Sequence, residues 1–248
     1  MTNLAMEYLT AVGGLLDRVR DEEQESIEQA AQLLADAIVE NRRIFAFGCT
    51  HSALPVQDVV YRAGGLMLIN PILGPGITSL DTHPTTLTSA MEKLEGYADA
   101  LLDATPIQSG DVLIVVSVSG RNAVPIEMAE SAKRRGLHVI ALTSMAYSSA
   151  VTSRHASGKK VYDFADVVLD NKVDVGDAVL EHEGVPQRFT PASGVTSTAL
   201  LHAVVSAAIE RVVAVGEEPT VFLAANVDGG AEYNARLTAQ HHDRIFFL

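Results

Sequence analysis

Hydrophobic and polar positions along this chain form two alternating patterns. Short, continuous apolar runs occur at 44–47, 66–69, 112–116, 139–142 and 167–169. Such runs are typical of parallel strands that are covered on both faces. Apolar residues at helical spacing between these runs predict helices at 55–62, 85–103 and 125–135. Strands and helices joined by short connections predict an α/β fold, a three-layer, doubly wound sandwich around a parallel five-stranded sheet.

The two ends of the chain are predicted to be helical. Helical spacing runs through residues 3–41 and is interrupted by the acidic stretch Asp21–Glu25, which favours a helix start at the positive end of a dipole. A long helix at 194–215, a strand-like segment at 220–224 and a last helix at 231–240 complete the pattern. We expect one domain over 1–248, with an N-terminal helical extension over about 1–41. Two loops, 71–84 and 170–193, are long enough to be functional.

Two segments, 43–65 and 111–136, share one plan: an apolar strand, a loop rich in hydroxyls, and a helix with proline near its start. Pro55 and Pro125 suit a first helical turn, where the missing N–H would have no partner. A helix N-terminus beside hydroxyl groups favours an anion, most often a phosphate. The loops supply Thr50, His51 and Ser52 in the first segment, and Ser117, Ser119, Gly120, Arg121 and Asn122 in the second.

The second loop, at 117–122, gives the stronger indication of phosphate binding. Ser117 and Ser119 follow a strand end, Gly120 permits a tight turn, and Asn122 is placed to cap the next helix. An ordinary strand-to-helix turn has the same composition, so the loop alone leaves both interpretations open. A second similar loop favours ligand binding, because open α/β sheets bind ligands beyond the carboxyl ends of their strands.

Charge and composition narrow the class of protein. The net charge of −13 argues against nucleic acid as a partner. Residues 1–10 lack the pattern of a secretory leader, and the apolar stretch 199–216 contains His202, Glu210 and Arg211, so we expect a cytoplasmic protein without a membrane span. The single cysteine, Cys49, allows no internal disulfide. No Cys/His cluster, Gly-x-Gly-x-x-Gly run or Walker motif occurs, so neither a metal nor a nucleotide cofactor is expected.

The pairing of 48–52 with 117–122, between flanking helices, resembles the SIS (sugar isomerase) domain of phosphosugar isomerases and binding proteins. The resemblance covers roughly residues 20–215. It implies that Ser52, Ser117, Ser119 and Asn122 hold a sugar phosphate, with Thr50, Gly120 and Arg121 of the same loops beside it. The stretches 49–73 and 166–177 look closest to stand-alone SIS proteins related to N-acetylmuramic acid 6-phosphate etherases, a group that includes N-acetylglucosamine-6-phosphate dehydratases.

Paired acidic residues are implied by the resemblance to the etherases, one for the C2 proton and one for the group that leaves C3. Those enzymes carry a glutamate ten residues beyond the serine of the first loop, where this chain has Arg62. Asp58, one turn earlier on a similar face, is a candidate replacement. A solvated aspartate, paired with Arg62 or with the helix dipole, is the alternative.

The second acidic site of the etherases corresponds to the glutamate-rich stretch 91–99. Glu92 and Glu95 are three residues apart, so on one helix they would share a face. A capping box between Ser89 and Glu92 would explain Glu92 without catalysis. No cap explains Glu95, which is therefore preferred as the base.

Two histidines are further candidates. His51 lies between the hydroxyls of the first loop, where it would assist ring opening or bind the sugar. His202 lies in an apolar helix and is either a core residue or, as in heptose-phosphate isomerases, catalytic. Ser193, with Thr196 and Ser197, would approach the ligand from the start of that helix. Asp170 and Asn171, at the end of the last strand, either contact the sugar or make a turn.

The resemblance implies a phosphosugar lyase that needs no cofactor, and by the same resemblance an N-acetylglucosamine-6-phosphate dehydratase is preferred over the etherase. An aldose–ketose phosphosugar isomerase and a non-catalytic sugar-phosphate sensor are the alternatives. The expected ligand is a phosphorylated aminosugar. Because SIS domains commonly pair so that one subunit's helix completes the other's site, and the helix from Asn3 to Arg20 has an apolar stripe without an obvious partner, we expect a homodimer or homotetramer.

Overall fold

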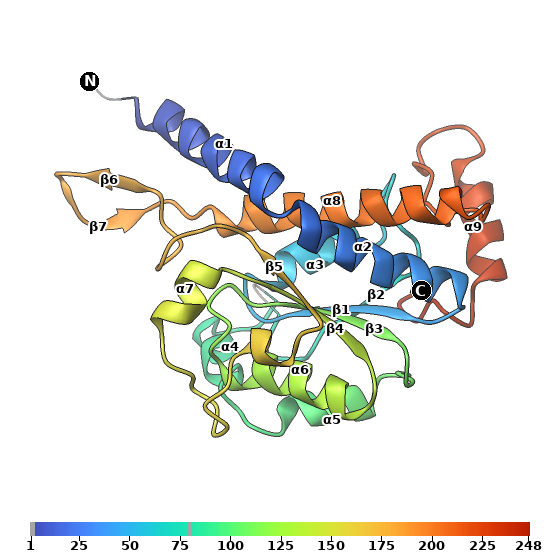
Figure 1. The fold of residues 1–248 in the computed structure, drawn as a ribbon, viewed down its shortest axis with the longest axis horizontal. Helices are drawn as coiled ribbons and strands as arrows, with labels where there is room; N and C mark the ends of the chain where they lie inside the picture. The colour runs from blue at the N-terminus through green and yellow to red at the C-terminus, as the bar shows by residue number, and fades with distance from the viewer. Residues whose placement is uncertain (1–2, 79–80) are drawn as a thin grey trace.

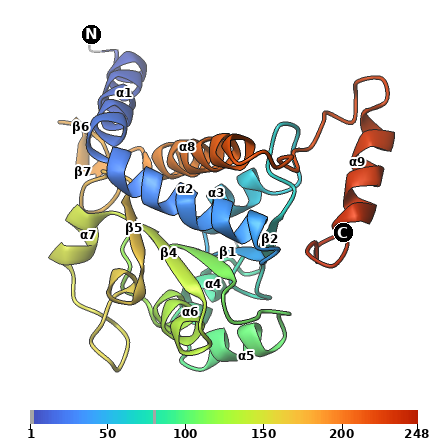
Figure 2. The same ribbon diagram turned by 45° about the vertical axis from the view of Figure 1, so that its right-hand side comes forward.

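The computed structural model describes residues 3–78 and 81–248. Its centre is a parallel sheet of five strands in the order β2-β1-β3-β4-β5. The strands are β1 (Ile44–Gly48), β2 (Ile69–Ile72), β3 (Val112–Val116), β4 (His138–Thr143) and β5 (Val167–Asp170). Helices cover both faces of the sheet, as Figures 1 and 2 show. The predicted α/β, three-layer, doubly wound fold is confirmed.

Side chains of each strand alternate between two hydrophobic layers. In β1, Ile44 and Ala46 belong to one buried cluster, whereas Phe45 and Phe47 belong to the other. This is the period of two that a strand imposes, and both faces are apolar because both are covered. The continuous apolar runs in the sequence have this physical origin.

One layer of helices carries α2 (Gln24–Val39), α3 (Ala53–Val59) and α8 (Ser193–Ala214). The opposite layer carries α5 (Tyr97–Asp103) and α6 (Ala123–Arg134), with the short α4 (Thr86–Met91) beside them. By length and composition α8 is apolar enough to cross a membrane, but it packs against α2 and α3, and its residues Leu200, Leu201 and Val204 are buried in the core. It is a core helix of this fold.

Four elements extend the sandwich. Helix α1 (Leu4–Glu22) and a hairpin of β6 (Leu180–His182) and β7 (Val185–Phe189) project together beyond the body, at the left in Figure 1. Helix α9 (Gly230–Gln240) lies at the other end of α8. Helix α7 (Met145–Ala150) follows β4, and the short helical turn η1 (Val161–Phe164) precedes β5.

Some predicted boundaries are wrong. The strand predicted at 66–69 begins at Ile69, because Met67 and Gly65 instead bond the backbone of Thr220 and Phe222. The helix predicted at 85–103 is two helices, broken before Gly96, which has φ +85°. The segment 220–224 forms a single antiparallel bridge, between Val221 and Leu66, and no strand. The sequence pattern does not predict α7, η1 or the hairpin.

Candidate functional site

The loops after β1 and β3 begin side by side at the topological switch point of the sheet, where the strand order reverses. Gly48 and Val116, the last residues of the two strands, are paired in register. From there the chain crosses to β2 on one side and to β4 on the other, so the loops diverge and leave a crevice. A cavity of about 270 Å³ opens there. Its lining comprises Thr50, His51, Ser52, Pro55, Glu92, Val116, Ser117, Val118, Ser119, Asn122, Tyr147, Gly176, Asp177, Ser193, Gly194 and Ser197.

The first loop is held in a strained conformation. Thr50 has φ +51°, a left-handed value that is unusual for a β-branched residue. Its N–H donates to the Ile77 carbonyl at 2.7 Å, and it forms an isolated parallel bridge with Thr78. Such strain is typical of functional sites that their surroundings over-determine. His51 and Ser52 follow directly, and His51 is exposed at the cavity.

The second loop turns at Gly120, which has φ +58°. A Cβ at this position would lie 2.7 Å from Ser148 Oγ and 3.2 Å from Thr143 Oγ1, so both backbone angle and space favour glycine. Ser117 is buried and Ser119 is half-buried, and both line the cavity. Gly120 and Arg121 do not line it; Arg121 instead donates to Thr152 Oγ1 at 3.2 Å.

Asn122 occupies the N-cap position of α6 but makes no side-chain cap. The capping role predicted for it is therefore wrong. Its Oδ1 accepts a hydrogen bond from Arg154 Nη1 at 3.0 Å. Asn122 and Glu92 both line the cavity.

Glu92 is the C-cap residue of α4 and lines the cavity. The capping box predicted with Ser89 is wrong, because both residues lie at the end of a helix rather than at its start. Burial raises the pKa of the Glu92 carboxyl, while the hydrogen bond from Asn122 and the charges of Arg154 and Lys93 oppose that rise. Burial, together with the charge of Glu92, raises the pKa of the neighbouring Cys49 thiol well above its ordinary value. A carboxyl with a raised pKa in a cavity is suited to proton transfer.

Glu95 lies outside the cavity lining and is exposed. Its Oε1 accepts from the Ala156 N–H at 3.1 Å. The prediction that Glu92 and Glu95 share a helix face is wrong, since α4 has ended before Glu95. Its predicted role as the base stays a prediction without support from its position in a single chain.

Asp58 and His202 lie together, one turn beyond the cavity wall on α3 and α8. His202 Nε2 is 2.8 Å from Asp58 Oδ2, and Arg62 Nη1 is 2.6 Å from Asp58 Oδ1. Neither Asp58 nor His202 lines the cavity. His202 is half-buried and paired, so the interpretation as an enclosed core residue is wrong.

The residues at the end of β5 contact α7 and α8, the helices that contribute Tyr147 and Ser197 to the cavity lining. Asp170 accepts from the Met145 N–H and pairs with Lys172 Nζ at 3.2 Å. Asn171 is buried and donates to Ser197 Oγ at 2.9 Å. Neither lines the cavity, whereas Ser197 does. Thr196 is buried and donates to the Ala192 carbonyl instead.

Several lining residues were not predicted as site residues, and Tyr147, Gly176 and Asp177 are among them. Tyr147 lies on α7, whose N-cap Ser144 accepts from the Tyr147 N–H at 3.0 Å, so a serine after the fourth strand was the available signal. Asp177 lies in the long loop before α8. It accepts from the N–H groups of Ala192 and Ser193 and from Ser193 Oγ, which places the predicted Ser193 at the cavity.

A family model described as the SIS domain matches residues 7–144, which is 138 of the 248 residues. The chain belongs to the SIS domain family. The resemblance of its two loops to that family is thereby confirmed. Within residues 3–78 and 81–248 of this SIS protein, no group of three or more His, Cys, Asp or Glu side chains is placed to hold a metal ion.

Curated relatives match this SIS protein along nearly its whole length. A UPF0309 protein from Streptomyces griseus subsp. griseus is 49% identical over 246 residues, covering 99% of this chain and 98% of the relative. UPF0309 protein SCO4393 from Streptomyces coelicolor is 51% identical over 243 residues, covering 98% and 97%. The chain therefore also belongs with the UPF0309 proteins.

Solved structures share the fold at low identity. Phosphoheptose isomerase GmhA from Neisseria gonorrhoeae superposes with a TM-score of 0.54 at 22% identity, over 84% of this chain and 97% of that one. A phosphoheptose isomerase from Francisella tularensis gives 0.54 at 16% identity, over 85% and 100%. At this identity the likeness describes the architecture of the SIS domain.

Proposed function

We propose that this SIS protein is a phosphosugar lyase, an N-acetylglucosamine-6-phosphate dehydratase that eliminates water across C2–C3. The observation that carries the proposal is the position of Glu92, whose carboxyl has a raised pKa and lines the same cavity as the serines of both loops. A base and a phosphate-binding surface in one cavity are what proton removal from a phosphosugar requires.

The phosphate is proposed to bind where the two loops meet. Ser52, Ser117 and Ser119 supply hydroxyl donors, and the first turn of α6 adds backbone N–H groups at the positive end of a 12-residue helix. Local donors of this kind outweigh a distant negative field, which salt screens beyond about 8–10 Å. The fold neighbours named phosphoheptose isomerases support a phosphosugar as ligand.

The proposed chemistry begins with the open-chain sugar, whose aldehyde acidifies the C2 proton. Glu92 takes this proton, and the electron pair of the C2–H bond forms the C2–C3 double bond as the C3–O bond breaks. The leaving hydroxyl takes a proton from an acid and departs as water. His51 and Tyr147 line the cavity and are candidates for that acid. Glu92 is favoured over Glu95 and Asp58 as the base, because neither of those lines the cavity.

An aldose–ketose phosphosugar isomerase is the second candidate. The names of the fold neighbours favour it, and it needs the same phosphate site with one base that moves a proton between C1 and C2. Both activities begin with removal of the same C2 proton, so Glu92 has the same role in each. A sugar-phosphate sensor would use the cavity without turnover.

Product analysis distinguishes these candidates. We expect N-acetylglucosamine 6-phosphate to lose one water and give an unsaturated product that absorbs ultraviolet light, and unphosphorylated N-acetylglucosamine to remain unchanged. Substituting Glu92→Gln should lower kcat by about 10²–10⁴-fold, since the amide cannot accept the proton. Mass spectrometry identifies the product, and ultraviolet absorbance measures the turnover of the wild type and of the variant.

The matched control is Glu130→Gln, the same substitution on α6 at a glutamate that pairs with Arg134 away from the cavity. It should retain wild-type turnover. If the product is instead an isomerised sugar phosphate of unchanged mass, the protein is an isomerase and the lyase proposal is refuted. If the protein binds a sugar phosphate but forms no product, it is a sensor. If it binds no aminosugar phosphate or ketose phosphate, the proposed phosphosugar site is refuted.

A further inference from the structure

We propose that Glu127 is a positioning residue, which sets the turn 92–96 from α6 and thereby holds the Glu92 carboxyl at the cavity. The catalytic meaning of this role rests on the proposed function, whereas its structural basis is independent of any substrate. Glu127 does not line the cavity, so it acts through the residue that does.

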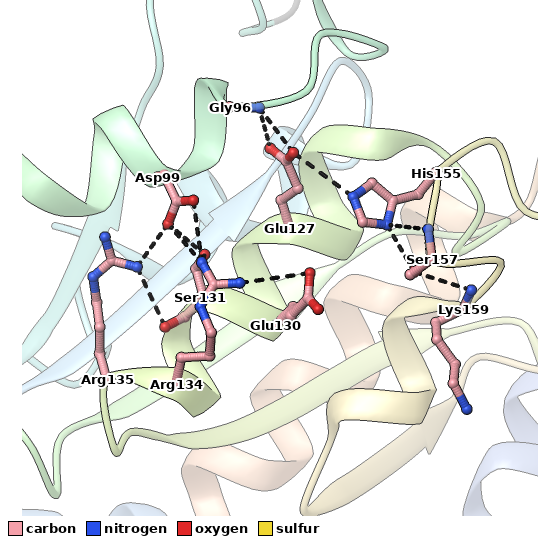
Figure 3. Close-up of polar contacts among 10 residues, drawn as sticks. All are labelled: Gly96, Asp99, Glu127, Glu130, Ser131, Arg134, Arg135, His155, Ser157 and Lys159. Atoms are coloured by element: carbon pink, nitrogen blue, oxygen red, sulfur yellow. Dashed lines mark hydrogen bonds and ion pairs between the residues drawn. The ribbon is translucent and has the colours of Figure 1, made fainter.

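The turn 92–96 separates α4 from α5 and takes its last hydrogen bond from another helix. The N–H groups of Glu92, Lys93 and Leu94 still donate to carbonyls of α4 at 3.0–3.1 Å. Gly96, with φ +85°, donates its N–H to the Glu127 side chain instead. Figure 3 shows both contacts, in which the two carboxylate oxygens accept at 2.8 Å. The direction of the turn therefore depends on a side chain of α6.

Helix α6 also holds the start of the turn. The Val124 N–H donates to the Glu92 carbonyl at 3.1 Å. Val124 and Glu127 are three residues apart on one helix, so they lie on the same face of it. Both ends of the turn are thus bonded to α6, by a backbone N–H at Glu92 and by a side chain at Gly96.

The same helix carries the loop that is proposed to bind phosphate. Its N-cap residue, Asn122, ends that loop and lines the cavity. A helix rises by a fixed distance of about 1.5 Å per residue, so the separation of Asn122 from Glu127 is set by the backbone. One element therefore places the proposed base relative to the proposed phosphate site.

Glu127 is nearly buried, which makes its partners important. A buried carboxylate is costly unless hydrogen bonds and favourable charges compensate for the loss of water. Gly96 supplies the hydrogen bond, and His155 lies on the other side, with Nε2 3.7 Å from Glu127 Oε1. The carboxylate is therefore held between specific partners, as Figure 3 shows.

Ser157 orients the His155 ring toward Glu127. The Ser157 N–H donates to His155 Nδ1 at 3.4 Å, and the Ser157 hydroxyl lies 2.8 Å from the same nitrogen. That hydroxyl accepts from the Lys159 N–H, which leaves its own hydrogen free to point at the ring. Because Nδ1 accepts, the ring proton is on Nε2, which faces the Glu127 carboxylate.

A second group of contacts keeps α5 attached to α6 without Glu127. One turn further along α6, Ser131 Oγ donates to Asp99 of α5. Arg134 and Arg135 pair with the same Asp99 carboxylate at 3.1 and 2.7 Å. A change at Glu127 alone should therefore free the turn while α5 stays in place.

The test compares Glu127→Met with Glu127→Gln. Both remove the charge and keep a side chain of similar length, but only glutamine retains an oxygen that accepts from the Gly96 N–H. We expect Glu127→Met to lower kcat for N-acetylglucosamine 6-phosphate about tenfold, since a reacting group misplaced by about 1 Å costs up to about 100-fold. KM should change little, because the serines of the two loops do not move. Glu127→Gln should stay close to the wild type.

A double-mutant cycle shows whether the loss acts through Glu92. In the Glu92→Gln background Glu127→Met should cause no further loss of kcat, because the base is already absent. Ser131→Ala is the control: it removes a hydrogen bond between α5 and α6 that does not contact the turn, so it should lower the melting temperature and retain kcat. An equal loss from Glu127→Met in both backgrounds, or equal losses from Glu127→Met and Glu127→Gln, would overturn the proposal.

A readout without substrate separates this proposal from the proposed function. The Glu92 carboxyl is titrated by its ¹³C resonance in glutamate-labelled protein, assigned by its absence in Glu92→Gln. Burial raises the pKa of this carboxyl, so a freed turn should lower its midpoint in Glu127→Met relative to Glu127→Gln. The two variants share the same charge and the same other groups near Glu92, which are Cys49, His51, Lys93, Tyr147, Arg154 and Asp177.

The difference between the two titrations therefore reports the position of Glu92. Coincident titrations would overturn the positioning role, whatever the activity. Separate titrations in a protein that turns over no phosphosugar would retain the positioning role and refute the proposed function.

Discussion

At the scale of single residues, Glu92 is a half-buried carboxyl in the lining of the cavity. Burial is the largest cause of its raised pKa, and the hydrogen bond and cations around it offset only part of that penalty. A group whose pKa is raised on folding stabilises the fold below its ordinary pKa of 4.5, and that contribution is lost as pH rises through the folded value. The charged form at neutral pH therefore lowers the free energy of unfolding.

We accordingly expect Glu92→Gln to be more stable than the wild type at pH 7, with a melting temperature higher by on the order of 2 °C. The amide retains the shape of the carboxyl but carries no charge. The difference should vanish at pH 4. Calorimetry of both proteins at the two pH values measures it. A Glu92→Gln protein that melts below the wild type at pH 7 would contradict the assigned burial penalty.

Residue types predicted the two hydroxyl-rich loops at the cavity but not the positions of the two glutamates. Serine, threonine and histidine directly after an apolar strand give a local signal, and Thr50, His51, Ser52, Ser117 and Ser119 all line the cavity. The roles of Glu92 and Glu95 depended on one helix continuing through both. Gly96 adopts φ +85° and begins a new helix, a change that depends on Glu127 of α6 holding its N–H. That contact between residues 31 positions apart has no signal in the local sequence.

At the scale of elements, the path of the loop after β3 depends on the left-handed backbone conformation of Gly120. Gly120 is followed directly by Arg121 and Asn122, so its backbone angle sets the direction in which α6 starts. An L side chain at such a left-handed φ costs about 1–2 kcal/mol. Here the contact with Ser148 Oγ adds to that cost.

Gly120→Ala should therefore lower the free energy of unfolding by about 1–2 kcal/mol and also weaken phosphosugar binding, because Ser119 and Asn122 shift with the turn. Urea unfolding and calorimetric titration with N-acetylglucosamine 6-phosphate measure the two effects. Gly14→Ala is the control, since this exposed helical glycine has open space for a Cβ. It should stabilise the protein slightly, by about 0.5–1 kcal/mol. Equal effects of the two substitutions would refute the argument.

The five strands could be predicted because a strand that is covered on both faces is a short, continuous apolar run in the sequence. The position of β2 was wrong by three residues for a physical reason. Leu66, Met67 and Leu68 are buried as a strand would be. However, Leu66 bridges to Val221, and Met67 donates to the Thr220 carbonyl, rather than to a neighbouring strand of the sheet. Pro71 belongs to β2, which tolerates proline because it is an edge strand of the sheet.

At the scale of the whole molecule, α1 has more apolar surface than one chain covers. Val12 and Val19 are buried against the body, whereas Met6 is 52% and Leu9 60% exposed on the part that projects beyond it. The Tyr8 hydroxyl donates to the Pro191 carbonyl just before α8, so the helix is held in this projecting position. The proposed dimer or tetramer would bury this end of α1 against a second chain.

The pair Met6→Asp and Leu9→Asp should shift the protein from the proposed dimer or tetramer to monomer in sedimentation velocity, with an unchanged far-ultraviolet circular dichroism spectrum. Charges in an apolar contact oppose association, whereas Met6→Leu with Leu9→Met retains the apolar surface and should retain the assembly. Activity should fall with the assembly if the partner completes the site. A monomeric wild type with full activity would refute the assembly.

Because Gly48 and Val116 occupy the same rung of the sheet, the spacing of the two loops is encoded in strand length. One residue inserted into β1 or β3 would advance its loop by about 3.3 Å and turn every later side chain to the opposite face. We therefore expect homologous chains to differ in length at the β6–β7 hairpin, which projects from the body, and not within these two strands.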